Sequence, residues 1–155
     1  MFLKKQIEKE IAEGGFNGKV TVSLEERGLV VSLQDTVLFV SGSAYLAPYA
    51  RAIITKIGIT LKPLPNYVSI EGHTDNVPIH NQQFLSNWEL SVARATNVVQ
   101  ALIADSGIPP ARLSATGYGE FRPVAPNDSD EHRQMNRRVD ILILSGTFNP
   151  VEPQK

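Results

Sequence analysis

The most constraining feature of the sequence is a long helical segment that starts at Ser86 and runs to about Asp105. Ser86 and Glu89 have the spacing of a capping box, in which each side chain satisfies an orphan backbone N–H group of the other residue. Gly107 and Pro109 follow the segment and are typical of a helix end. The predicted buried stripe of this amphipathic helix is Trp88, Val92, Ala95, Val99 and Leu102.

Two other stretches have helical periodicity. After Pro48, which suits a first helical turn, apolar residues recur until Pro63 and Pro65 end the pattern; they are Tyr49, Ile53, Ile57 and Leu61. Within residues 1–13, Leu3, Ile7 and Ile11 repeat every four residues before a glycine-rich break. This first helix is either the helical end of a linker or an element that packs on the domain or on a second copy of the chain.

Short segments of alternating hydrophobicity predict the strands. Residues 19–34 are typical of a hairpin, with apolar alternation on both sides of a turn at Glu25–Gly28. Single strands are expected at residues 67–74, 113–118 and 138–144, and residues 35–47 are expected to form a loop. Because helices separate some strands and a hairpin joins others, we expect an α+β domain, with two long helices packed on one face of a mixed β-sheet.

Composition excludes several classes of protein. The chain has 155 residues, which corresponds to one domain, and 15 Lys and Arg face 16 Asp and Glu, giving a net charge of −1. That balance argues against a nucleic-acid binder, which usually has a basic excess. Cysteine is absent, so disulfides, thiolate metal sites and a cysteine nucleophile are excluded. No apolar run approaches the roughly 20 residues of a membrane span, and no signal peptide is visible.

A candidate binding site follows the strand expected at residues 67–74. Asp75 lies just beyond the strand end, where ligand sites of sheet-and-helix domains commonly lie. Arg94 is expected at the margin of the next helix's buried stripe, with Asn87 two turns earlier on roughly the same side. A carboxylate, a guanidinium and an amide suit a zwitterionic ligand. The alternative is that Asp75 and Arg94 simply form a structural ion pair.

The histidines have no convincing metal spacing. His73 and Asp75, expected on one strand face, could be combined with His80 and His132, but the pattern of a zinc site is missing. We therefore expect no metal, no cofactor and no enzymatic activity, and the remaining catalytic alternative is a metal-dependent hydrolase that uses His73 and Asp75.

A basic cluster contains Arg133, Arg137 and Arg138. It is either a solvated charged face, or Asn136 and one of the two arginines after it line the same groove as Asp75. Neighbouring acidic residues argue against a stripe that contacts phosphates.

Four ordered blocks resemble the OmpA-like peptidoglycan-binding family over about residues 30–144. They are Gly72-His73-Thr74-Asp75-Asn76, Leu90-Ser91-x-x-Arg94-Ala95, Gly117-Tyr118-Gly119-Glu120 with Pro123 and Asn127, and Glu131-x-Arg133-x-x-Asn136-Arg137-Arg138-Val139. Within the family, the segments at residues 37–44 and 77–91 resemble the MotB-type branch of flagellar stator proteins.

The resemblance implies a mixed sheet with two main helices, and non-catalytic binding of the diaminopimelate-containing stem peptide of peptidoglycan. It places the ligand carboxylate of the family on Asp75, its arginine on Arg94 and its amide on Asn87. Further contributors that it implies are Phe39, Ser41, Thr74, Leu90, Arg137 and Arg138.

The resemblance also implies how the chain is organised. Residues 1–18 would be the remnant of a periplasmic linker helix, residues 19–146 the OmpA-like domain, and residues 147–155 a flexible tail. The chain would be the periplasmic part of an inner-membrane protein, homodimeric, with a MotA-type partner and a membrane helix not contained in this sequence. The alternative is an outer-membrane-to-wall linker of the OmpA or Pal kind.

Overall fold

The structure, a computed structural model, describes residues 2–146 of the chain. Its helices are α1 (Phe2–Glu13), α2 (Asp35–Leu38), α3 (Pro48–Leu61), α4 (Asn87–Ser106) and α5 (Asp130–Asn136), with a short 3₁₀ helix η1 (Pro110–Arg112). Its strands are β1 (Val20–Glu25), β2 (Gly28–Gln34), β3 (Val68–His73), β4 (Leu113–Gly117) and β5 (Arg138–Leu144). The predicted hairpin and single strands are therefore present.

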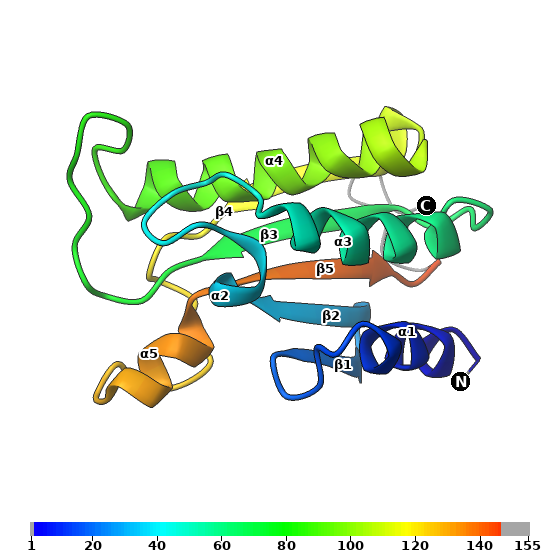
Figure 1. Cartoon of the computed structure of the whole chain (residues 1–155), viewed down its shortest axis with the longest axis horizontal. Coiled ribbons are helices and arrows are strands. Elements are labelled where there is room, and N and C mark those ends of the chain that lie inside the picture. Colours follow the sequence, from blue (N-terminus) through cyan, green and yellow to red (C-terminus); the bar gives the residue numbers. More distant parts are fainter. Residues whose placement is uncertain (1, 147–155) are drawn as a thin grey trace.

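The strands form one mixed sheet in the order β1-β2-β5-β3-β4. β3 and β4 run parallel, because α4 forms the crossover between them, and the other neighbouring strands are antiparallel. Helices α3 and α4 pack on each other, and α4 covers β3 and β4 (Figure 1). The prediction of an α+β fold with two long helices on one face of a mixed sheet is confirmed.

Alternation along the strands separates the two faces of the sheet. Val68 and Ile70 of β3 belong to the main hydrophobic core, together with alternate residues of the neighbouring strands. Ser69, Glu71 and His73 point to the opposite face, as predicted. The long helices α3 and α4 do not cover that face, and we call it the open face of the sheet.

Helix α1 packs on β1 and α3. Ile7 is fully buried and Ile11 is 3% exposed, so both belong to the main core. Of the two interpretations of this helix, packing on the domain is the one the structure adopts. The division of the chain at residue 18 stays a prediction, and the predicted tail at residues 147–155 lies outside the described residues. None of the helices in the described part of the chain is long and apolar enough to cross a membrane.

Helix α4 begins and ends close to the predicted residues. Ser86 is the N-cap, and its hydroxyl accepts from Trp88 N at 3.1 Å while it donates to the Glu89 carboxylate. The two side chains therefore bond each other, and the reciprocal backbone bonds of a capping box do not form. At the other end Gly107 adopts the left-handed conformation with φ 73°, which suits a glycine.

The buried face of α4 differs from the predicted stripe. Trp88 and Val92 are 48% and 45% exposed. The predicted buried stripe was wrong at these two positions, because α3 and the segment that follows α2 cover a different side of the helix. The buried residues are Leu90, Ser91, Arg94, Ala95, Val98, Ala101, Leu102 and Ser106.

The segment expected to be a loop at residues 35–47 is more ordered than predicted. It begins with the single-turn helix α2, and Phe39 then pairs with Leu46 in an isolated β-bridge. Val37, Leu38 and Phe39 are buried, which explains why this short segment holds a fixed conformation beside the end of β3.

Candidate functional site

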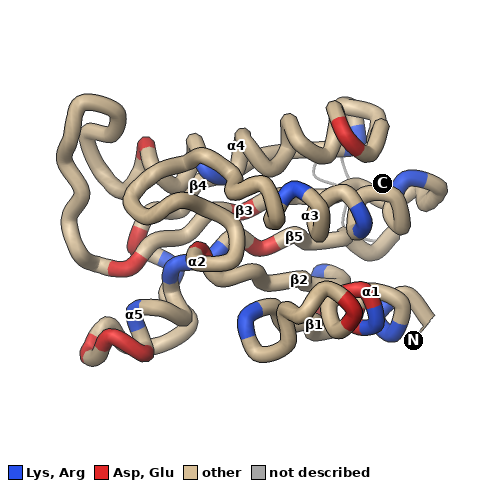
Figure 2. Tube along the Cα trace, in the orientation of Figure 1, with Lys and Arg blue, Asp and Glu red and all other residues tan. Residues whose placement is uncertain are grey.

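A pocket of about 590 Å³ lies where β3 ends, between α2, the loop after it and the first turns of α4. The residues of the predicted site that line it are Phe39, Ser41, Thr74, Asp75, Asn87, Leu90, Arg94 and Arg137. The other lining residues are Asp35, Thr36, Gly42, Val77, Pro78 and Ile79. Acidic and basic positions lie side by side around α2 in this part of the molecule (Figure 2).

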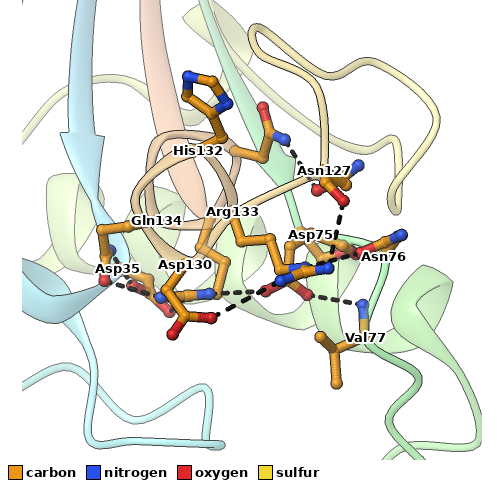
Figure 3. A network of polar contacts seen from close by, with 12 residues as sticks. Asp35, Asp75, Asn76, Val77, Asn127, Asp130, His132, Arg133 and Gln134 are labelled. Carbon is orange, nitrogen blue, oxygen red and sulfur yellow. Dashed lines mark hydrogen bonds and ion pairs between the residues drawn. The ribbon is translucent and has the colours of Figure 1, made fainter.

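Asp75 is held at the floor of the pocket by two contacts. Its Oδ2 atom lies 2.6 Å from Nη1 of Arg137, and its Oδ1 atom accepts from Val77 N at 2.9 Å (Figure 3). The carboxylate is almost fully buried, with 5% of the residue exposed. It therefore lies beside a guanidinium and is fixed in direction by the backbone.

Arg94 is buried beneath the loop after α2, with 4% of the residue exposed. Its Nε donates to Ser43 O at 2.9 Å, and its guanidinium lies 4.7 Å above the Phe39 ring. The predicted place of Arg94 at the margin of the α4 stripe was thus wrong. Burial lowers the pKa of Arg94, and the nearby Asp35 carboxylate opposes that shift, so the side chain stays cationic.

Asp35 joins the two arginines of the pocket. Its Oδ2 atom lies 3.4 Å from Nη1 of Arg94 and 3.4 Å from Nε of Arg137. Its Oδ1 atom accepts from Gln134 Nε2 at 2.9 Å (Figure 3). Asp75, Arg137, Asp35 and Arg94 therefore form a row of alternating charge, which we call the pocket charge row.

The suggested ion pair between Asp75 and Arg94 does not form. Asp75 pairs with Arg137 and Arg94 pairs with Asp35. Asp35 was missed by the sequence analysis, because it lies in a segment that was expected to be a loop. Its only signal was its position directly after the last residue of the predicted hairpin.

Asn87 and Thr74, two further residues of the predicted site, form hydrogen bonds with the backbone of the loop after β3. Asn87 donates to Val77 O at 3.1 Å and lies 3.4 Å from Asp75 O, so it fixes the loop after β3 on the first turn of α4. Thr74 is buried, and its hydroxyl donates to Asp75 O at 2.8 Å.

Arg138 and Asn136 lie outside the residues that line this pocket. Arg138 points to the open face of the sheet, where its Nε lies 3.2 Å from Asp140 Oδ2. Asn136 is fully buried, and its Oδ1 accepts from Val124 N at 2.8 Å and Ala125 N at 3.0 Å. Of the basic cluster, Arg137 alone shares the groove with Asp75, since consecutive residues of an extended segment point to opposite sides.

The three histidines lie in three different parts of the chain, namely β3, the loop before α4, and α5. His73 lies on the open face, whereas Asp75 lines the pocket, so the expectation that the two share a strand face was wrong. His80 contacts Leu85 O at 3.1 Å, and His132 pairs with Asp128. The histidine and aspartate set of the hydrolase alternative is therefore not brought together.

The pocket charge row offers both signs of charge within one open groove. An ammonium group suits the Asp75 end, and a carboxylate suits the Arg94 end. The apolar side chains of Phe39, Leu90 and Ile79 line the same space and can contact the carbon chain of a ligand that carries both charges.

Residues 38–137 match the model of the OmpA family. This chain belongs to the OmpA family. Its sequence is 39% identical over 146 residues to Motility protein B of Bacillus subtilis, covering 92% of this chain and 55% of that protein. The chain spans 55% and 58% of the length of two curated Bacillus subtilis relatives that it matches.

Solved structures match most of the chain. A putative MotB-like protein from Desulfovibrio vulgaris has a TM-score of 0.82 at 33% identity, covering 94% of this chain and 91% of that one. The cell wall anchor of the type VI secretion system (T6SS) from Pseudomonas aeruginosa has a TM-score of 0.81 at 32% identity, covering 92% and 99%. The chain is thus an OmpA-family domain, and its similar proteins include MotB proteins and a cell wall anchor.

Proposed function

We propose that this domain binds peptidoglycan without cleaving it, and that the pocket receives the diaminopimelate of the stem peptide. The observation that carries the proposal is the pocket charge row, in which Asp75 and Arg94 lie at the two ends. The similarity to a cell wall anchor and to motility proteins supports the same conclusion at the level of the class.

The chemistry of the ligand suits the pocket. The side-chain end of diaminopimelate carries an ammonium and a carboxylate on one carbon. In our proposal Asp75 accepts from the ammonium, and Arg94 donates to the carboxylate in the geometry that guanidinium groups favour. We expect the Arg137 side chain, and not that of Arg94, to move away from Asp75 when the ligand binds. The reason is that 30% of the Arg137 side chain is exposed, whereas only 5% of the Arg94 side chain is.

Calorimetric titration with a diaminopimelate-containing muropeptide tests the proposal. Wild type is expected to bind, and Asp75→Ala and Arg94→Ala are expected to lose binding. Because Arg94 is buried, Arg94→Lys is included; it keeps the charge but loses the two-pronged donor geometry, and weaker binding is expected.

Arg51 and Asp105 provide the matched controls. They form an ion pair of 2.7 Å on the surface, outside the residues that line the pocket. Arg51→Ala and Asp105→Ala are expected to bind as wild type does. A wild type that does not bind, or equal binding by Asp75→Ala and wild type, would contradict the proposal.

We further propose that the wall contact anchors a flagellar stator. In this proposal the domain is the periplasmic part of an inner-membrane protein that forms a homodimer and works with a MotA-type subunit. The 39% identity to Motility protein B supports this choice. An outer-membrane linker of the OmpA or Pal kind would use the same pocket with a different anchor.

The coding sequence upstream of this segment distinguishes the two anchors. A transmembrane helix with an acidic residue is expected for a stator. A barrel or a lipidation signal there would contradict the stator proposal and leave the wall-binding proposal standing.

A further inference from the structure

Three potential metal ligands meet on the open face of the sheet, away from the pocket charge row. Glu71 and His73 are two residues apart on β3, and Asp140 of β5 is the direct cross-strand partner of Glu71. One ligand atom from each of the three side chains lies within 4.8 Å of the others. Neighbouring strands fix this arrangement, so it does not depend on a loop.

The ring of His73 is buried without hydrogen bonds. Only 5% of the residue is exposed, and neither Nδ1 nor Nε2 has a hydrogen-bond partner among the described residues. Its Nε2 lies 3.7 Å from Asp140 Oδ2, too far for a hydrogen bond. Buried polar atoms are rarely left unpaired, because each one has given up its hydrogen bonds to water.

Only one of the two carboxylate oxygens of Asp140 accepts a hydrogen bond from the described residues. Its Oδ2 accepts from Arg138 Nε at 3.2 Å, whereas its buried Oδ1 has no hydrogen-bond partner in the described part of the chain. This resembles a ligand carboxylate whose outer oxygen is oriented by a second residue. The free oxygen and the unpaired imidazole lie on the same side of the sheet.

We propose that Glu71, His73 and Asp140 form a binding site for a divalent transition-metal ion such as Zn²⁺. One imidazole nitrogen and two carboxylate oxygens are zinc ligands, with bonds of about 2.0–2.2 Å. Small side-chain rotations close the present spacing onto one ion. An adjoining cavity of about 210 Å³, lined by these three residues and Tyr118, has room for a bound water as the fourth ligand.

The charges around the site set its affinity. Glu71 accepts long hydrogen bonds of 3.3 and 3.4 Å from Arg27, whose side chain is 52% exposed and free to turn outward. Arg138 is buried and pairs with Asp140, and Arg122 lies over the Tyr118 ring. Glu25 also lines the cavity, so three carboxylates and three guanidinium groups surround it. Binding therefore requires Arg27 to leave Glu71 and is weaker than at a site without arginines.

Protonation of the imidazole does not compete with the metal near neutral pH. Burial, with Arg138 and Arg122 nearby, lowers the pKa of His73 from 6.5 to about 3. The ring is therefore neutral, which is the form that binds metals.

Calorimetric titration of the untagged chain with zinc chloride tests the proposal. One Zn²⁺ per chain is expected, and His73→Gln and Asp140→Asn are each expected to weaken binding by more than about tenfold. His80→Gln and His132→Gln are the matched controls, because both histidines are outside the site, and they are expected to bind as wild type does. Circular dichroism without metal verifies that each variant is folded.

Several outcomes would overturn the proposal. They are a wild type without stoichiometric binding, a folded His73→Gln variant that binds equally well, or binding that is lost in His132→Gln, which would assign the ion to the surface pair with Asp128. If His73→Gln does not fold, nitrogen NMR of the wild-type imidazoles decides. Zinc must then shift the ring signals of His73, and unshifted signals would reject the site.

Discussion

Asp35 is the residue on which the charge balance of the pocket depends. It accepts contacts from Arg94, Arg137 and Gln134, and its side chain is 14% exposed. Without its carboxylate, the buried Arg94 would lose its nearest negative charge. A buried charge that loses its partner is far more costly than a surface charge that does so.

Replacing Asp35 by Asn tests this role. We expect Asp35→Asn to lower the free energy of unfolding by about 3 kcal/mol, because the Arg94 guanidinium is left buried without its counter-charge. Urea unfolding measures the change. Asp105→Asn, which removes the carboxylate of the surface pair with Arg51, is expected to cost no more than about 1 kcal/mol; equal losses in the two variants would contradict the argument.

His73 makes folding stability depend on pH. Its pKa is about 3 in the folded chain, well below 6.5, so the unfolded chain binds the extra proton between these values. The contribution of the neutral ring is fully present above about pH 6.5 and is lost as the pH falls towards 3, at up to about 1.4 kcal/mol per pH unit.

Urea unfolding at pH 7 and pH 5, with a chelator present, measures this effect. Wild type is expected to lose about 2 kcal/mol more than His73→Gln between the two values. His80→Gln is expected to follow wild type, since His80 remains exposed. A His73→Gln variant with the same pH dependence as wild type would show that the buried ring is not responsible.

Helix α4 lies close to β3, and a glycine makes this possible. A Cβ atom placed on Gly72 would lie 2.2 Å from Ser91 O, a backbone atom that cannot turn away. The contact fixes α4 over the end of β3, which in turn places Asn87 and Arg94 opposite Asp75. The same packing explains the glycine at Gly117, whose Cβ would meet Val92 N at 2.5 Å.

Substituting Gly72 by Ala is therefore expected to lower the free energy of unfolding by about 2–3 kcal/mol, since α4 must move away from the sheet. Thermal unfolding measures the loss. Gly146→Ala has no neighbour within 4 Å of the added carbon and serves as the control, with a change expected within about 0.5 kcal/mol. Comparable losses at both glycines would contradict the close-packing argument.

Across the whole molecule, one core joins α1 to the sheet and to α3. We expect Ile7→Ala to lower the free energy of unfolding by about 2–5 kcal/mol, because the side chain is fully buried. Ile59→Ala, at a position that is 58% exposed on α3, is the control and is expected to have a small effect. If Ile7→Ala also had a small effect, α1 would be an appendage and not part of the cooperative unit.

Periodicity predicted the fold well and the site less completely. Alternation and helical spacing depend on near neighbours in the chain, so β3 and the ends of α4 could be located from sequence. The ion-pair partners of Asp75 and Arg94 could not be located from sequence. They are Arg137 and Asp35, which lie about a hundred residues apart in the chain and become neighbours only through the pairing of β2 with β5. The face of α4 was misjudged for a similar reason, since the covering layer and not the helix decides which residues are buried.

The metal ligands illustrate the same limit. Glu71 and His73 are close in sequence, but Asp140 joins them only through the pairing of β3 with β5. Spacing rules for metal sites apply to ligands within one helix, turn or loop, and so they cannot detect a set shared by two strands.

The opposite directions of β3 and β5 have a mechanical consequence. β3 runs towards the pocket, whereas β5 runs towards the end of the molecule where α1 begins (Figure 1). Tension between a ligand held beside Asp75 and an attachment at the far end of β5 would slide these neighbouring strands along each other. In that shear geometry the ladder bonds share the load and do not open one after another.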